Sequence, residues 1–184
     1  MTDTKLSISR NAMNYGGMTG VVLFLVFILS SILGNDASGI MQFTGYAVLA
    51  IGIYIGTKKY RDGELKGIMT YGNAFYSGFL ISFFAGVLIA FAIYLYITFV
   101  DDSLIEKIME QTEQNLMDSG RSDEEIEQTM EASQYFMNPT SMALFSVLGY
   151  TIFGSLISLL TAAFLKKESN GSGDAFDNFI QQNQ

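Results

Sequence analysis

The stretch YGNAFYSGFLISFFAGVLIAFAIYLYITFV, residues 71–100, decides the fold because it runs for 30 residues without a charged side chain. A bilayer core about 30 Å thick requires about 20 apolar residues in a helix that crosses it. A helix on the surface of a soluble domain would instead carry polar residues every few positions along one face. The stretch therefore predicts a transmembrane helix.

Three other runs share this character. They cover residues 12–34, 39–57 and 139–165, and none contains a charged side chain. The first could also be a signal peptide, but the second follows it almost directly, which argues against cleavage. The sequence thus predicts an all-α integral membrane bundle of four transmembrane helices, with residues 101–138 inserted between the third and the fourth.

The composition agrees with this class and narrows the chemistry. Hydrophobic residues make up 49% of the chain and charged residues 15%, against roughly 25% charged residues in soluble domains. The sequence has no histidine and no cysteine, which removes the commonest metal ligand and the thiolate nucleophile. Intramembrane proteases and ion-coupled transporters usually hold an ionisable side chain inside a span, and the four runs hold none. We therefore expect no enzymatic activity, no cofactor and no metal site.

The polar side chains inside the runs are mostly hydroxyls. Ser30, Ser82, Tyr150 and Ser158 are examples, and we expect such hydroxyls to bond to their own helices rather than to line a pore. Nucleic-acid binding is not expected either, because the chain has no soluble domain with a basic face.

Basic residues predict the orientation in the membrane. Eight of the ten lie before the first run, between the second and third, or after the fourth. By the positive-inside rule that side is cytoplasmic, with both termini inside. Asp62-Gly63 is the predicted turn of the inner loop, and Thr70 is the predicted N-cap of the third span. The predicted topology anchors are Lys58, Lys59, Arg61, Lys66, Lys166 and Lys167.

Small residues recur at four-residue spacing within the runs. Such rows allow helix backbones to approach closely in a membrane. Packing within one bundle is the favoured interpretation, and a homodimer seam on the third span is the alternative. The predicted packing residues are Gly16, Gly20, Gly52, Gly56, Gly78, Ser82, Gly86, Gly154 and Ser158.

The outer segment is acidic and helical in pattern. Eleven of the 18 acidic residues lie between positions 101 and 131. Gly120 predicts the end of a first helix, which could continue directly from the third span. Ser122 and Glu125 form a capping box that opens a second helix, and Asn138-Pro139 predicts the start of the fourth span. The candidate partner surface is Leu104, Ile108, Met109, Leu116, Ile126 and Met130.

Three roles remain open for this hairpin. It could dock a partner, lie over the bundle as a lid, or simply pack on itself. The last is the usual case, because charged residues that recur at the helical period usually mark a face exposed to solvent. Cation binding is disfavoured because no EF-hand spacing is present. Residues 1–168 are the predicted transmembrane domain, and the polar, glycine-rich residues 169–184 are a predicted disordered cytoplasmic tail.

One resemblance rests on short motifs around the inner loop. They are Tyr60-Arg61-Asp62, Gly67, Thr70-Tyr71-Gly72, Ala74-Phe75 and Gly78, together with SDEEIEQTM and SLISLLTAAFLKK. Over roughly residues 14–168 the chain resembles the uncharacterised bacterial membrane family filed as domain of unknown function 4199. The resemblance implies a four-helix integral membrane protein of a bacterial inner membrane, and it implies no activity.

Two functional hypotheses follow. The first is a non-enzymatic multi-pass inner-membrane protein, a scaffold, accessory or regulatory subunit that acts through the outer hairpin. The alternative is a small transporter or channel component that works as an oligomer. The expected partners are the lipid bilayer and either another protein or a second copy of the chain.

Overall fold

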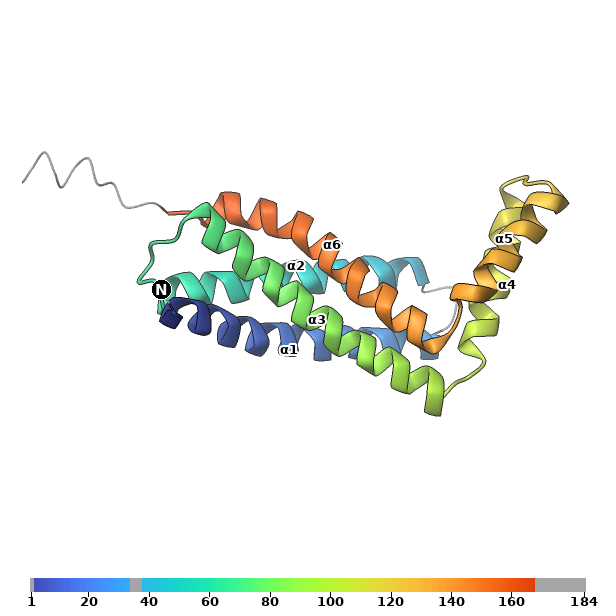
Figure 1. The fold of residues 1–184 in the computed structure, drawn as a ribbon, viewed down its shortest axis with the longest axis horizontal. Coiled ribbons are helices and arrows are strands. Elements are labelled where there is room, and N and C mark those ends of the chain that lie inside the picture. The colour runs from blue at the N-terminus through green and yellow to red at the C-terminus, as the bar shows by residue number, and fades with distance from the viewer. Residues whose placement is uncertain (1, 34–37, 168–184) are drawn as a thin grey trace, which may run out of the picture.

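The computed structural model describes residues 2–33 and 38–167, which form six helices. Four of them run side by side as a bundle, and the other two form a hairpin that projects from one end (Figure 1). The bundle helices are α1 (Thr2–Leu33), α2 (Ser38–Gly63), α3 (Tyr71–Phe99) and α6 (Pro139–Leu165), and the hairpin helices are α4 (Leu104–Asp118) and α5 (Asp123–Phe136).

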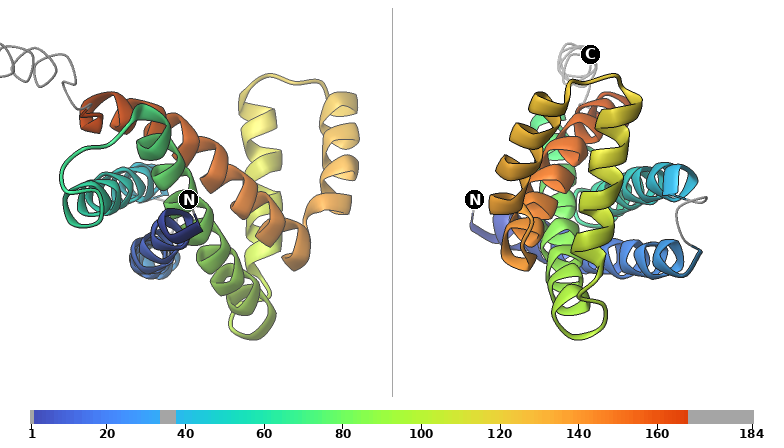
Figure 2. Two further views of the ribbon diagram at one scale, coloured as in Figure 1. Left: turned by 60° about the vertical axis from the view of Figure 1, so that its left-hand side comes forward. Right: turned by 90° about the vertical axis from the view of Figure 1, so that its right-hand side faces the viewer.

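Helix α3 occupies the middle of the bundle. It packs against α1, α2 and α6, and the views from two further directions agree on this arrangement (Figure 2). The innermost side chains include Leu49 and Ile53 of α2 and Ile81 and Ala85 of α3, none of which has any exposed surface.

The outer surface of the bundle is apolar. Leu25 on α1, Phe91 on α3 and Leu160 and Phe164 on α6 are each at least 60% exposed. A large exposed apolar surface marks contact with a membrane or another protein. In the described residues, three segments are long and apolar enough to cross a bilayer: Ser7–Leu33, Tyr71–Phe99 and Pro139–Leu165. Helix α2 is not one of these three segments.

The predicted helix starts are confirmed. The Thr70 side chain accepts a hydrogen bond from the Asn73 backbone N–H, and Asn138 caps α6 in the same way with Pro139 in its first turn. Both hydrogen bonds of the capping box between Ser122 and Glu125 are present at the start of α5. These signals lie within four residues of one another, so local geometry alone satisfies them.

Two helix boundaries differ from the prediction. Helix α1 begins at Thr2 rather than near residue 12, and α2 continues to Gly63 rather than ending near residue 57. Lysine and arginine are good helix formers, so the loss of hydrophobicity beyond residue 57 does not end the helix. The chain reverses later, at Lys66 and Gly67, whose φ angles are 51° and 87°.

The sequence left open that the third span continues directly into the first outer helix. The structure shows that it does not. Helix α3 ends at Phe99 and α4 starts at Leu104, after a sharp change of direction (Figure 1). Gly120 has a φ of 71° and follows the end of α4 as predicted. The predicted tail, residues 169–184, lies outside the described residues.

Candidate functional site

The predicted topology anchors gather at the end of the bundle opposite the hairpin. Lys58, Lys59 and Arg61 belong to the last turns of α2, Lys66 to the connection that follows, and Lys166 and Lys167 come directly after α6. The start of α1 lies at the same end (Figure 1). All five lysines are exposed, so this end presents a dense set of positive charges.

The Arg61 side chain makes two hydrogen bonds. Its Nε donates to Asp62 Oδ1 over 2.7 Å, and its Nη1 donates to the Leu165 carbonyl over 3.4 Å. The hydrogen bond from Arg61 holds the pKa of the Asp62 carboxyl below its ordinary value. Arg61 thus joins the end of α2 to the end of α6.

A backbone clip fixes the same end of the bundle. Met69 and Lys167 exchange two backbone hydrogen bonds of 2.9 Å each, in an isolated antiparallel bridge. Tyr60 and Met69 are 1% exposed, and they pack with Ile8, Ala74 and Ala162 in a small apolar cluster. The connection between α2 and α3 is therefore an ordered structure.

The predicted packing residues lie at contacts between helices of this one chain. On α1, a β-carbon built on Gly16 would lie 2.7 Å from the Ile81 carbonyl oxygen, and one on Gly20 would lie 2.9 Å from Leu88 Cβ. Glycine at these two positions lets the backbones of α1 and α3 approach closely. On α2, Gly52 lies against Thr19 and Gly56 against Tyr15 and Ile81.

The small-residue row of α3 faces α6. Gly78 lies against Ser158, Ser82 against Gly154, and Gly86 against Tyr150 and Val147. The Ser82 and Ser158 hydroxyls donate to backbone carbonyls of their own helices, at Phe79 and Gly154. The seam considered for a homodimer is thus filled by α6 of the same chain.

The predicted partner surface is largely withdrawn from solvent. Ile126 is only 7% exposed, and the other members, Leu104, Ile108, Met109, Leu116 and Met130, are half-buried. The apolar side chains that the hairpin exposes are different ones: Met117, Tyr135 and Phe136. The sequence did not single these out, because they lie off the apolar stripe of each helix.

An acidic groove runs between α4 and α5. Met117, Ile126 and Met130 contribute apolar lining, and Gln134 adds an amide. Four carboxylates complete the lining: Glu113, Asp123, Glu127 and Glu131. Within the described residues, no three acidic side chains are placed to hold a metal ion together. The groove is therefore better suited to a basic surface than to a chelated cation.

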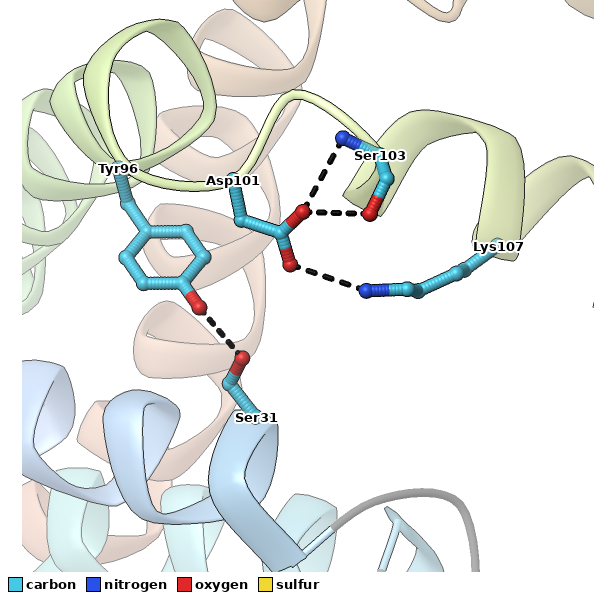
Figure 3. A network of polar contacts seen from close by, with 5 residues as sticks. All are labelled: Ser31, Tyr96, Asp101, Ser103 and Lys107. Atoms are coloured by element: carbon cyan, nitrogen blue, oxygen red, sulfur yellow. Dashed lines mark hydrogen bonds and ion pairs between the residues drawn. The ribbon is translucent and has the colours of Figure 1, made fainter.

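A polar network forms the junction between α3 and α4 (Figure 3). Asp101 Oδ1 accepts from the Ser103 backbone N–H over 3.1 Å and from its hydroxyl, and Asp101 Oδ2 accepts from Lys107 Nζ over 3.1 Å. These hydrogen bonds, that of Ser103 first, lower the pKa of the Asp101 carboxyl. Close by, the Ser31 and Tyr96 hydroxyls share a 2.6 Å hydrogen bond that ties α1 to α3.

These features define the class of the protein: an all-helical chain with three helices long and apolar enough to cross a membrane, which points to a membrane protein. Residues 14–167 match the family described as "Protein of unknown function (DUF4199)". The chain belongs to that family, as its motifs around the inner loop suggested. No curated protein and no solved structure matches the chain.

Proposed function

We propose that the chain is a four-span protein in which α2 is the fourth transmembrane helix. Helix α2 has 26 residues, about 39 Å at 1.5 Å per residue, which exceeds the bilayer core. It packs alongside α1, α3 and α6 within the bundle. The lysines and Arg61 in its last turns extend toward the headgroups while the rest of the helix stays in the hydrocarbon.

The basic end is cytoplasmic in this proposal, and the hairpin is extracytoplasmic. Each lysine or arginine near an anionic leaflet contributes about 1 kcal/mol of attraction. The five exposed lysines described above, together with Arg61, favour this orientation in a bacterial inner membrane.

The protein acts as a non-enzymatic docking subunit through the α4–α5 hairpin. The observation that carries this proposal is that α4 and α5 pack mainly on each other, although they stand across the α3–α6 side of the bundle's end (Figures 1 and 2). None of the residues that line the acidic groove belongs to a bundle helix, so the groove is open to a partner. A partner with basic and apolar side chains complements that groove.

Cross-linking in the native membrane tests the proposal. A photoreactive residue at Gln134, at the groove, is expected to cross-link a second protein. The cross-link is lost in the double variant Glu127→Gln/Glu131→Gln, whose groove has two fewer charges. The matched control, Asp118→Asn/Glu124→Gln, removes two exposed acids outside the groove and keeps the cross-link.

A flux assay separates the docking proposal from the alternative, a transporter or channel component. Solute flux through vesicles that contain only this protein supports the transporter or channel component. Flux of that kind, or a cross-link that is insensitive to both double variants, rules out docking at the groove.

A further inference from the structure

A cavity of about 310 Å³ opens between the hairpin-side halves of α1, α2 and α6. From Leu23, its deepest lining residue on α1, to the end of that helix at Leu33 the rise is about 15 Å. The cavity is therefore within the depth of one leaflet. Its lining is Leu23, Val26, Phe27, Ser30, Gly45, Tyr46, Ser146, Gly149, Tyr150 and Phe153, none of which carries a charge at neutral pH.

The two glycines of the cavity differ from the packing glycines. A β-carbon on Gly149 would meet no atom within 4 Å, and one on Gly45 would come no closer than 3.9 Å, to Leu23 Cδ2. At Gly154, one turn further along α6, a β-carbon would collide with Ser82. Gly45 and Gly149 thus leave open space where the other glycines bring helices together.

Three hydroxyls at the cavity lack a hydrogen-bond partner. Across the described part of the chain, Ser30, Tyr46 and Tyr150 make no hydrogen bond with their hydroxyl groups. Ser146, in the same lining, donates to the Met142 carbonyl, and Ser31 pairs with Tyr96. Within the described residues, the Ser77 and Thr151 hydroxyls also lack a partner, but they are fully buried and do not line the cavity. The expectation that such groups bond to their own helices is thus wrong for Ser30 and Tyr150.

Unpaired hydroxyls at this depth require a partner. In the hydrocarbon region an unsatisfied polar group costs several kcal/mol, because no bulk water is there to replace the bond. Two phenols are good donors, so the missing group is a hydrogen-bond acceptor. With no cation in the lining, a charged acceptor would be desolvated without compensation.

We propose that the cavity binds an uncharged amphiphile through an ester carbonyl. The carbonyl accepts hydrogen bonds from Tyr46 and Tyr150, and an acyl chain lies against Leu23, Phe27 and Phe153. A volume of about 310 Å³ corresponds to about ten water-sized groups of about 30 Å³ each. The cavity thus holds an ester and part of an acyl chain rather than a whole phospholipid.

Binding of synthetic probes to the purified protein in detergent tests the chemistry. The probes are a photoreactive monoacylglycerol with a ten-carbon chain, its ether analogue without the carbonyl, and the decanoate anion. We expect the ester to label the cavity at least fivefold more strongly than either of the others. Equal labelling by ester and ether overturns the proposal, because the carbonyl would then have no role.

Variants distinguish the role of the tyrosine hydroxyls from the role of the open cavity volume. Tyr46→Phe and Tyr150→Phe keep the shape, and each should weaken the ester probe by roughly two- to tenfold, the worth of one hydrogen bond, while leaving the ether unchanged. Gly149→Leu fills the cavity and should abolish labelling. Gly17→Leu is the matched control, since a β-carbon there also meets no atom within 4 Å and the residue lies outside the cavity. Unchanged labelling of Gly149→Leu, or of both phenylalanine variants, overturns the proposal.

Native mass spectrometry distinguishes the two sources of the ester. A glycerolipid that co-purifies with the natural chain and is lost from Gly149→Leu identifies a membrane lipid. A chain that purifies without lipid, but binds the monoacylglycerol probe with the same variant profile, identifies a free amphiphile. Both results support the proposed ester site, and neither depends on the hairpin.

Discussion

At the scale of single residues, Gly16 and Gly17 are neighbours in the sequence with opposite surroundings. A β-carbon on Gly16 would lie 2.7 Å from both the Ile81 carbonyl oxygen and Phe84 Cβ, whereas one on Gly17 would meet nothing within 4 Å. The Ile81 oxygen belongs to the backbone of α3 and cannot move without shifting that helix. The same substitution should therefore have different effects at the two positions.

We predict that Gly16→Ala lowers the free energy of unfolding by about 1–3 kcal/mol, the usual range for overpacking. Gly17→Ala should leave it unchanged or raise it by up to ~1 kcal/mol, because alanine is the better helix former. Unfolding of the detergent-solubilised protein in increasing denaturant measures both. Equal effects of the two substitutions would contradict a tight contact between α1 and α3 at Gly16.

The Asp101 carboxyl should make the local stability of the α3–α4 junction depend on pH. Because its hydrogen bonds with Ser103 and Lys107 lower the folded-state pKa, the carboxylate stabilises the α3–α4 junction above the unfolded pKa of about 3.9. That contribution is lost as the pH falls through the lowered, folded-state pKa. Hydrogen exchange of the Ser103 amide, corrected for its intrinsic rate, should be slower in the natural chain than in Asp101→Asn at pH 6.

The difference should diminish as the pH falls through the lowered pKa of the Asp101 carboxyl, because protonation removes its charge. Asp102→Asn is the matched control, since Asp102 is its exposed neighbour and should behave as the natural chain over the whole pH range. A pH-independent difference between the natural chain and Asp101→Asn would show that the charge has no part in holding the junction.

At the scale of helices, the capping box should stabilise the first turn of α5. Ser122→Ala removes the side-chain acceptor for the Glu125 N–H and keeps the backbone N–H that donates to Glu125 Oε2. Loss of such a side-chain cap typically costs about 1 kcal/mol. Amides in the first turn of α5 should then exchange roughly fivefold faster, in proportion to that free energy.

Ser133→Ala is the matched control for this prediction. The Ser133 hydroxyl lies in the same helix and donates only to the Thr129 carbonyl of that helix, so its loss should leave exchange at the start of α5 unchanged. Faster exchange in both variants would indicate a general effect of serine removal instead of a cap.

Helix starts could be predicted from the sequence, and the end of α2 could not. Thr70, Ser122 and Asn138 each satisfy backbone N–H groups three residues away, so their signals are local. Asp62-Gly63 also has a local turn signal, yet it belongs to α2. There Arg61 reaches the Leu165 carbonyl and the Met69–Lys167 bridge closes the connection, and both contacts join segments far apart in the chain.

At the scale of the whole molecule, the sequence also could not predict which helix each glycine contacts. Four-residue spacing predicts that Gly78 and Gly154 face some helix, but only the assembled bundle brings α3 against α6 and leaves Gly149 beside open space. A glycine that packs a seam and a glycine that lines a cavity look identical in a one-dimensional pattern. The cavity could therefore not be predicted from the sequence.

The proposed orientation can be tested directly because the sequence contains no cysteine. Ser119 lies at the turn between the hairpin helices, and Gly63 lies at the basic end of the bundle; both are exposed. Because the same bundle separates the two positions (Figure 1), an impermeant reagent should reach only one of them in intact cells. We predict that a membrane-impermeant maleimide labels Ser119→Cys and not Gly63→Cys in cells with a permeabilised outer membrane.

Breaking the inner membrane should then expose Gly63→Cys to the same extent, which excludes an unreactive thiol as the reason for its protection. The inverse pattern would place the lysine-rich end outside, and the positive-inside argument would fail for this chain. Labelling of both variants in intact cells would mean that the bundle does not separate its two ends. In that case the three apolar helices would have to lie on or between membranes, and the fourth span would have no basis.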